Sequence, residues 1–266
     1  MNSRLFLSIV GLFFLAAKLN AETPADREQT AIHEYQEGLD RRTIPDEARQ
    51  HFRRAAGIYE QIWYQDQIQS PYLARNRAQA CLNSGDYARA IQAYHQGLRI
   101  DPREPGLRAG LNYCRDQIDF PADVKAKVAA RPRNSILLHA SATTYGLCVA
   151  CVYLLALVLS ARGWMSRNPL WWIAGGMVLV SALVMWGALV WEVHRFDVDH
   201  QRAVAIVSKS TKAYQGNGTT YPSLFTEPLP AGTEMLILLR RGGWIQVQFS
   251  NGAIGWIESR SVVTVE

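Results

Sequence analysis

Two long stretches without a charged residue constrain the fold of this chain more than any other feature. They cover residues 136–160 and 170–191, and neither contains Asp, Glu, Lys or Arg. Each has about the 20 apolar residues that a helix needs to cross a bilayer. Trp171 and Trp172 at one end of the second stretch, and Trp186 and Trp191 towards the other, are typical of membrane interfaces. The sequence therefore predicts two transmembrane helices joined by a short loop at 161–169.

A third apolar segment, at the N-terminus, is shorter and has a different pattern. Arg4 precedes the apolar run Leu5 to Ala17, and the small residue Ala21 fits the position before a signal-peptidase cut. We expect residues 1–21 to be a cleaved signal peptide, and an uncleaved N-terminal anchor is the alternative. Either version exports the segment that follows.

The orientation of the hairpin follows from its flanking charges. The connecting loop contains Arg162 and Arg167 and no acidic residue, which favours a cytoplasmic loop. Four basic residues just before the first helix disagree, but long exported domains are translocated largely regardless of charge. We therefore expect both soluble parts, residues 22–135 and about 195–266, on the external (periplasmic) side of a bacterial inner membrane. The net charge of +5 is modest and does not indicate a nucleic-acid partner.

The first soluble part contains a helical repeat. Small residues at fixed spacing let two antiparallel helices approach closely, and Asp86 can cap the second helix after the turn. The repeat-packing residues occur at the spacings of a tetratricopeptide repeat and are Ala78, Gly85, Tyr87, Ala90, Tyr94, Gly97 and Pro102.

Weaker copies flank this repeat. Ala48, Phe52 and Ala55 reproduce the spacing of a second helix, and a single helix near residues 107–118 is expected to cap the array. We predict an all-α tetratricopeptide-like domain over residues 22–120, followed by a linker at 121–135. Such arrays present a concave surface that binds a partner's peptide or helix, and a spacer role is the alternative.

The C-terminal part has the pattern of a small β-domain. Apolar residues alternate at 235–239 and 244–249, with Gly242-Gly243 and Asn251-Gly252 positioned as hairpin turns. Residues 204–266 resemble a bacterial SH3 (SH3b) domain, which implies a small all-β SH3-like barrel that residues 192–203 join to the second membrane helix. The matching segments are Val204–Val207, Gly216–Gly218, Pro230–Glu234, Gly243-Trp244 and Gly255-Trp256.

The candidate ligand-binding residues of this domain are mostly aromatic. If a groove exists, Tyr214 and Tyr221 would stack on a peptide or glycan and Arg241 would reach acidic groups. Trp244 would either pack in the core or line the groove, whereas Trp256 is expected in the core because Gly255 permits close packing. Tyr214 stands where the SH3b loop often carries an Arg.

The order of the parts resembles the BatE-type proteins of the Bat (aerotolerance) family. The resemblance rests on the repeat at Gly85–Ile91, the segment Leu111–Gln117, the paired spans and the SH3b pattern. It implies an envelope protein that works beside von Willebrand A-domain membrane proteins and a MoxR-type ATPase, but it does not show a biochemical activity.

The chain offers little catalytic chemistry. It lacks a phosphate loop and a G-x-S-x-G elbow, and His33 has no second His at the spacing that a zinc-protease helix needs. We expect no cofactor and no metal. Cys148 and Cys151 lie within an apolar helix and are expected to be inert, whereas Cys81 and Cys114 are either free or joined as a disulfide.

Two classes of function remain. The first is a non-catalytic, membrane-anchored envelope scaffold that binds a protein through its repeats and a protein or peptidoglycan through its SH3b domain. The second is an accessory or targeting subunit of a cell-wall enzyme, or a weak hydrolase, which requires a catalytic pair in an exported part. In the membrane, the small residues Ala142, Gly146 and Ala150 form a stripe that predicts contact with the second span or a partner helix.

Overall fold

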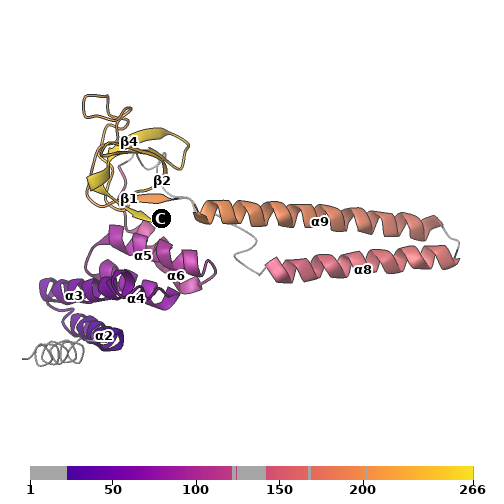
Figure 1. Cartoon of the computed structure of the whole chain (residues 1–266), viewed down its shortest axis with the longest axis horizontal. Coiled ribbons are helices and arrows are strands. Elements are labelled where there is room, and N and C mark those ends of the chain that lie inside the picture. The colour runs from indigo at the N-terminus through magenta and orange to yellow at the C-terminus, as the bar shows by residue number, and fades with distance from the viewer. Residues whose placement is uncertain (1–22, 122–123, 125–141, 167–168, 202, 266) are drawn as a thin grey trace, which may run out of the picture.

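The structure is a computed structural model that describes residues 23–121, 124, 142–166, 169–201 and 203–265. The expected signal peptide at 1–21 and most of the expected linker at 121–135 lie outside these residues. Figure 1 shows the two soluble parts gathered at one end of a long helical hairpin. Secondary structure follows the chain order predicted from sequence: helices, two apolar helices, then strands.

The N-terminal part is an array of antiparallel helices. Each helix has a clear start signal, because four begin with Pro in the first turn and three are capped by Thr23, Ser70 and Asp86. Gly85 makes the turn before α5 with a φ of +85°, a conformation that favours glycine. The helices are α2 (Pro24–Asp40), α3 (Pro45–Tyr64), α4 (Pro71–Asn83), α5 (Tyr87–Ile100) and α6 (Pro105–Asp116).

Helices α8 (Ala142–Ser166) and α9 (Pro169–Gln201) form the hairpin. Both are long and apolar enough to cross a membrane, over Thr143–Met165 and Ile173–Trp191. Helix α9 continues beyond Trp191 to Gln201, so most of the expected linker at 192–203 is helical. A continuous helix therefore connects the apolar segment to the C-terminal part.

The C-terminal part is a five-stranded antiparallel sheet in the order β4-β3-β2-β1-β5. Gly242 and Gly243, with positive φ, turn β2 into β3, as the sequence predicts. β4 and β5 are the edges of the sheet, which does not close into a barrel. The strands are β1 (Val204–Val207), β2 (Glu234–Arg241), β3 (Trp244–Gln248), β4 (Ile254–Glu258) and β5 (Val262–Val265).

The expectation that Trp256 is a core residue is wrong. In β4 the buried positions are Gly255 and Ile257, and Trp256 between them is only partly buried on the other face. Successive side chains of a strand point to opposite faces, so placing Gly255 inward turns Trp256 outward. The main chain of Trp256 exchanges two hydrogen bonds of 2.8 Å with that of Tyr214, which ties the 208–233 loop to the edge of the sheet.

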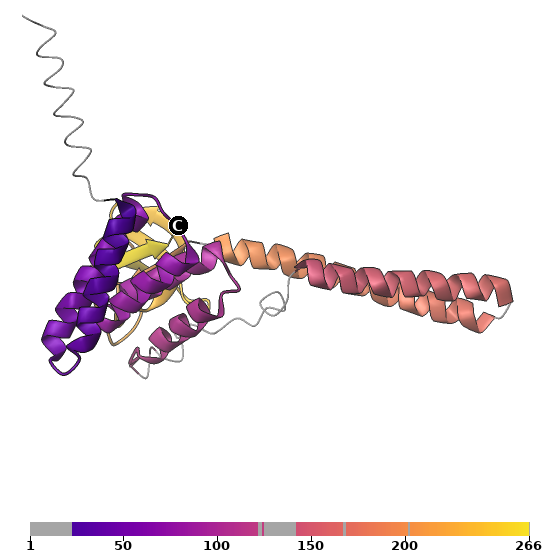
Figure 2. The same ribbon diagram turned by 90° about the horizontal axis from the view of Figure 1, so that it is seen from below.

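The two soluble parts pack on each other. Ile91 of α5 and Leu111 of α6 share one buried apolar cluster with Ile206 of β1 and Val265 of β5. Figures 1 and 2 both show the sheet against α5. Residues more than a hundred positions apart therefore form one core, which requires both parts to lie on the same side of any membrane that α8 and α9 cross.

Candidate functional site

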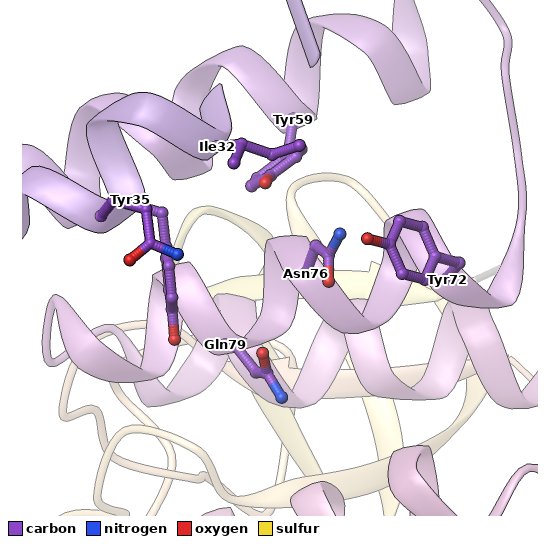
Figure 3. A pocket seen from close by; sticks show the side chains of 7 residues that line it. Ile32, Tyr35, Tyr59, Tyr72, Asn76 and Gln79 are labelled. Atoms are coloured by element: carbon purple, nitrogen blue, oxygen red, sulfur yellow. The ribbon is translucent and has the colours of Figure 1, made fainter. Parts of the chain in front are cut away.

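The helical array has a groove between α2 and α4, with α3 behind it (Figure 3). The lining residues from α2 and from α4 recur every three or four positions, so those of each helix share one face, and α3 contributes Tyr59. The groove has a volume of about 200 Å³. It is lined by Ile32, Tyr35, Gln36, Tyr59, Tyr72, Asn76 and Gln79.

The lining is uncharged and rich in phenol and amide groups. Tyr35 accepts a 2.8 Å hydrogen bond from Asn83 Nδ2 and packs edge-to-face on Phe52, so its ring is fixed. Burial raises the pKa of both Tyr35 and Tyr59, which keeps these phenols neutral. The base of the groove is therefore an ordered surface that can donate and accept hydrogen bonds without presenting a charge.

The rim is more exposed. Tyr72 is 54% exposed, and the guanidinium of Arg75 lies 5.6 Å from the centre of its ring. Arg75 also pairs with Glu104 at 3.5 Å, which links the rim to the segment before α6. Asn and Gln side chains can bond both the N–H and the C=O of an extended peptide, while Tyr72 and Ile32 can cover apolar side chains. The groove is thus suited to a peptide segment.

Four of the seven predicted repeat residues are buried at helix–helix contacts, whereas Gly85 is exposed in the turn before α5. Ala78, Ala90 and Tyr94 are buried, and Tyr87 and Pro102 are half-buried at the start of α5 and just after its end. A Cβ atom at Gly97 would lie 2.8 Å from that of Ala74. Sequence reasoning missed Gly110, whose Cβ would come within 2.3 Å of the Tyr94 ring.

A buried ion cluster joins the array to the sheet. Arg115 of α6 donates through Nε and Nη2 to the two carboxylate oxygens of Glu234, at 2.6 and 2.7 Å. His95 Nε2 of α5 lies 2.6 Å from Oε2 of the same carboxylate. Burial would raise the pKa of Glu234, but the hydrogen bonds from Arg115 and the charge of His95 outweigh it and lower that pKa to about 2. Glu234 is therefore ionised and held at the interface.

The structure brings together three of the four predicted ligand residues of the sheet, Tyr214, Trp244 and Arg241. Tyr214 and Trp244 pack edge-to-face, with ring centres 5.7 Å apart. Tyr221 packs instead over Gly216 in its own loop, where an added Cβ would lie 2.6 Å from the Tyr221 ring. Arg241 is exposed at the β2–β3 turn, opposite Trp244 in the ladder.

Between the apolar helices, the predicted small-residue stripe faces open space. Gly146 and Ala150 line a gap of about 300 Å³ with Ala182 and Trp186 of α9, and nothing lies within 4 Å of a Cβ built at Gly146. The helices approach more closely at Gly175, where an added Cβ would lie 2.4 Å from Ser160 Oγ. The side chain of Ala142 lies outside the described residues. The stripe stays a prediction for a partner helix.

The two thiols of the helical array are not poised for chemistry. Cys81 and Cys114 are free and buried, and burial raises the pKa of each to about 12, so neither forms a nucleophilic thiolate. Within the described ranges, no group of three His, Cys, Asp or Glu side chains could hold a metal ion.

Comparison with known proteins identifies one segment. A family model described as Tetratricopeptide repeat matches residues 71–104, which cover α4, α5 and the turn that follows. No curated protein and no solved structure matches the chain. The array therefore contains a tetratricopeptide repeat, a module that typically binds proteins and is not catalytic.

Proposed function

We propose that this protein is a non-catalytic, membrane-anchored scaffold of the bacterial envelope that holds a protein partner in the groove of its helical array. The observation that carries this proposal is the uncharged groove between α2 and α4, in a domain that matches a tetratricopeptide repeat. Its ordered phenols and amides can bond a peptide backbone, and its exposed rim can cover apolar side chains.

The anchor in this proposal is the α8–α9 hairpin, with both soluble parts on the periplasmic side of the inner membrane. The length and apolar composition of the two helices support this anchor. The two soluble parts share one core, so both must lie on the same side of the membrane. The loop that joins α8 to α9 contains Arg162 and Arg167 and no acidic residue, which favours a cytoplasmic position for this end of the hairpin.

Candidate partners come from the resemblance to BatE-type proteins. Such proteins work beside von Willebrand A-domain membrane proteins and a MoxR-type ATPase system, so the membrane proteins of that system are the first partners to test. A segment of such a protein that lies near the membrane would reach the groove without leaving the envelope.

Photo-crosslinking tests the groove directly. A crosslinking amino acid at Tyr72 should capture a partner in intact membranes, whereas one at Tyr64 should not. Tyr64 is a matched control because it is 48% exposed, against 54% for Tyr72, but lies at the end of α3 outside the groove. Replacing Asn76 and Gln79 by Ala should reduce capture about tenfold, which corresponds to a combined loss of about 1.4 kcal/mol for two side chains at the centre of the interface. Unchanged capture by this folded variant would exclude the groove as the binding site.

We propose a second binding surface on the sheet, comparable to that of an SH3b domain. The contact between Tyr214 and Trp244, with Trp256 partly exposed on the same strand pair, favours it over a purely structural role. Tyr221 and Arg241 would extend this surface, and its ligand would be a protein or peptidoglycan. The alternative role for the whole protein, an accessory or targeting subunit of a cell-wall enzyme or a weak hydrolase, would use the same surface.

The double variant Tyr214→Ala, Tyr221→Ala tests this second surface. We expect it to stay folded, because Tyr214 is only partly buried and Tyr221 is 50% exposed, and the aromatic contact itself adds about 0.5–1.5 kcal/mol beyond the buried area. Co-sedimentation with purified peptidoglycan, or pull-down of a protein partner, should fall clearly relative to Tyr113→Ala, which removes an exposed tyrosine from α6 instead. Full binding by the folded double variant would leave the sheet as a structural module.

A further inference from the structure

A second hollow continues the groove towards the first turns of α2 and α4. It has a volume of about 400 Å³ and is lined by the start of both helices, by Ile62 near the end of α3 and by Ile68 just after it. On α2, Glu28 of this hollow precedes Ile32 of the groove by about one helical turn. On α4, Leu73 precedes Asn76 in the same way. The second hollow, which we call the end pocket, therefore opens on the same face as the groove.

Together the groove and the end pocket have the length of a short peptide. The lining residues of α2 run from Ala25 to Gln36, a rise of about 16 Å along the helix. An extended peptide of about five residues spans the same length. In Figure 3, Tyr72 and Tyr35 lie at opposite ends of the groove, and Tyr72 is the chain neighbour of Leu73 in the end pocket. A segment that starts in the end pocket can therefore follow the groove past Tyr72 to Tyr35.

The end pocket is apolar at its base. Ile62 and Leu73 are buried there, whereas Ile68 is 44% exposed at its edge. Gln67 closes the end of α3 with a φ of 56°, and Ile68 N donates to Ile62 O at 3.2 Å, so Ile68 is held at the pocket. One water occupies roughly 30 Å³, so the pocket has room for a large apolar side chain. Such a side chain would cover Ile68.

Glu28 is the one charged residue among the described residues that line the groove and the end pocket. Burial raises the pKa of Tyr59, and electrostatic interaction with Tyr72 and Glu28 raises it further, so the Glu28 carboxylate lies near a phenol of the groove. Arg27 beside it pairs with Asp66 at 3.0 Å, whereas Glu28 takes part in no ion pair with another described residue. A segment that covers this carboxylate must supply a positive charge, because a carboxylate buried without a partner is costly.

We infer that the groove binds an extended peptide segment in which a lysine or arginine lies two positions from a large apolar residue. The apolar side chain fills the end pocket, the basic side chain pairs with Glu28, and the main chain continues along Asn76 and Gln79. Side chains two positions apart in an extended peptide lie about 7 Å apart on one side of the chain. The amides favour an extended segment over a helix, whose backbone groups are already bonded to one another. This inference rests on the proposed function of the groove and names the chemistry of its partner.

Selection from a random heptapeptide library displayed on phage tests the inference. The full chain in lipid nanodiscs is the bait, and enriched peptides are synthesised and their Kd is measured by fluorescence anisotropy. The wild type should enrich peptides with a basic residue two positions from Leu, Ile, Phe or Met. Glu28→Lys should select against basic residues. Glu47→Lys is the matched control, because it changes the net charge equally at a 53% exposed side chain of α3 outside both hollows, and it should select as the wild type does.

Glu28→Gln should weaken the enriched peptides several-fold, and added salt should weaken binding to the wild type more than binding to this variant. Peptides that need Asn76 and Gln79 but bind Glu28→Gln as tightly as the wild type would overturn the inference and leave the groove as a binding site. A wild type that enriches no peptide, or binding that survives Asn76→Ala with Gln79→Ala, would overturn the inference and the proposed function together. Dimers of the purified chain that Glu28→Lys dissociates would make a second copy the occupant and also overturn it.

Discussion

Replacing Glu234 by Ala should destabilise the soluble body by about 3–5 kcal/mol, the usual cost of breaking a buried ion pair. The substitution leaves Arg115 and His95 at the interface without the carboxylate that both contact. It also weakens the interface at which α5 and α6 share one apolar core with β1 and β5. Thermal unfolding of the full chain, followed by tryptophan fluorescence, should show a melting temperature about 10 °C lower.

Glu258→Ala is the matched control. Glu258 lies in the same sheet and pairs with Arg260 at 2.6 Å, but the Arg260 side chain is 83% exposed. Exposed pairs of this kind contribute about 0–1 kcal/mol, so the control should melt close to the wild type. Equal melting temperatures for the two variants would mean that the array and the sheet are not held together through Glu234.

The same carboxylate predicts a pH dependence with a definite sign. Its pKa is lowered from 4.5 to about 2 in the folded protein, so the unfolded chain binds the proton more readily. The stabilisation, about 3 kcal/mol, is fully present above pH 4.5 and is lost as the pH falls towards 2. The wild type should therefore lose stability over this range more steeply than Glu234→Gln. Parallel curves would contradict the assignment.

The individual domains could be predicted from the sequence because their signals are local. The helix pairs follow from small residues and turn signals within about 34 positions, and the apolar helices follow from uncharged runs. The hairpin turn at Gly242-Gly243 needs only the two glycines. In each case the residues that determine the element are near one another in the chain.

The contact between the domains could not be predicted in this way. Glu234 meets His95 and Arg115 across 139 and 119 positions, and no periodicity links such distant residues. Trp256 failed for a different reason. The neighbouring Gly255 was expected to permit close packing of Trp256 in the core, but Gly255 itself takes the inward position in β4, so Trp256 lies on the other face of the strand. The groove was predicted only as the concave surface of an array, because its lining comes from three helices.

Replacing Gly97 by Trp should unfold the helical array. A Cβ atom at this position would already lie 2.8 Å from the Cβ of Ala74 and 2.9 Å from a methyl group of Leu107, so α4, α5 and α6 leave no room for a ring. Overpacking typically costs about 1–3 kcal/mol, and an indole at a site too small for a methyl group should exceed that range. Circular dichroism of the full chain should show loss of helix at a temperature where the wild type remains folded.

Gly57→Trp separates the effect of crowding from the effect of adding an indole to a helix. Gly57 lies inside α3, but nothing is found within 4 Å of a Cβ built there, so the ring can extend into solvent. This control should melt near the wild type, since a surface substitution usually changes stability by less than about 0.5 kcal/mol. Because α5 also carries His95 to the sheet, Gly97→Trp should uncover β1 and β5 to protease as well. If Gly97→Trp keeps the wild-type melting temperature, α5 does not pack through Gly97, and the contacts assigned between α4, α5 and α6 are wrong.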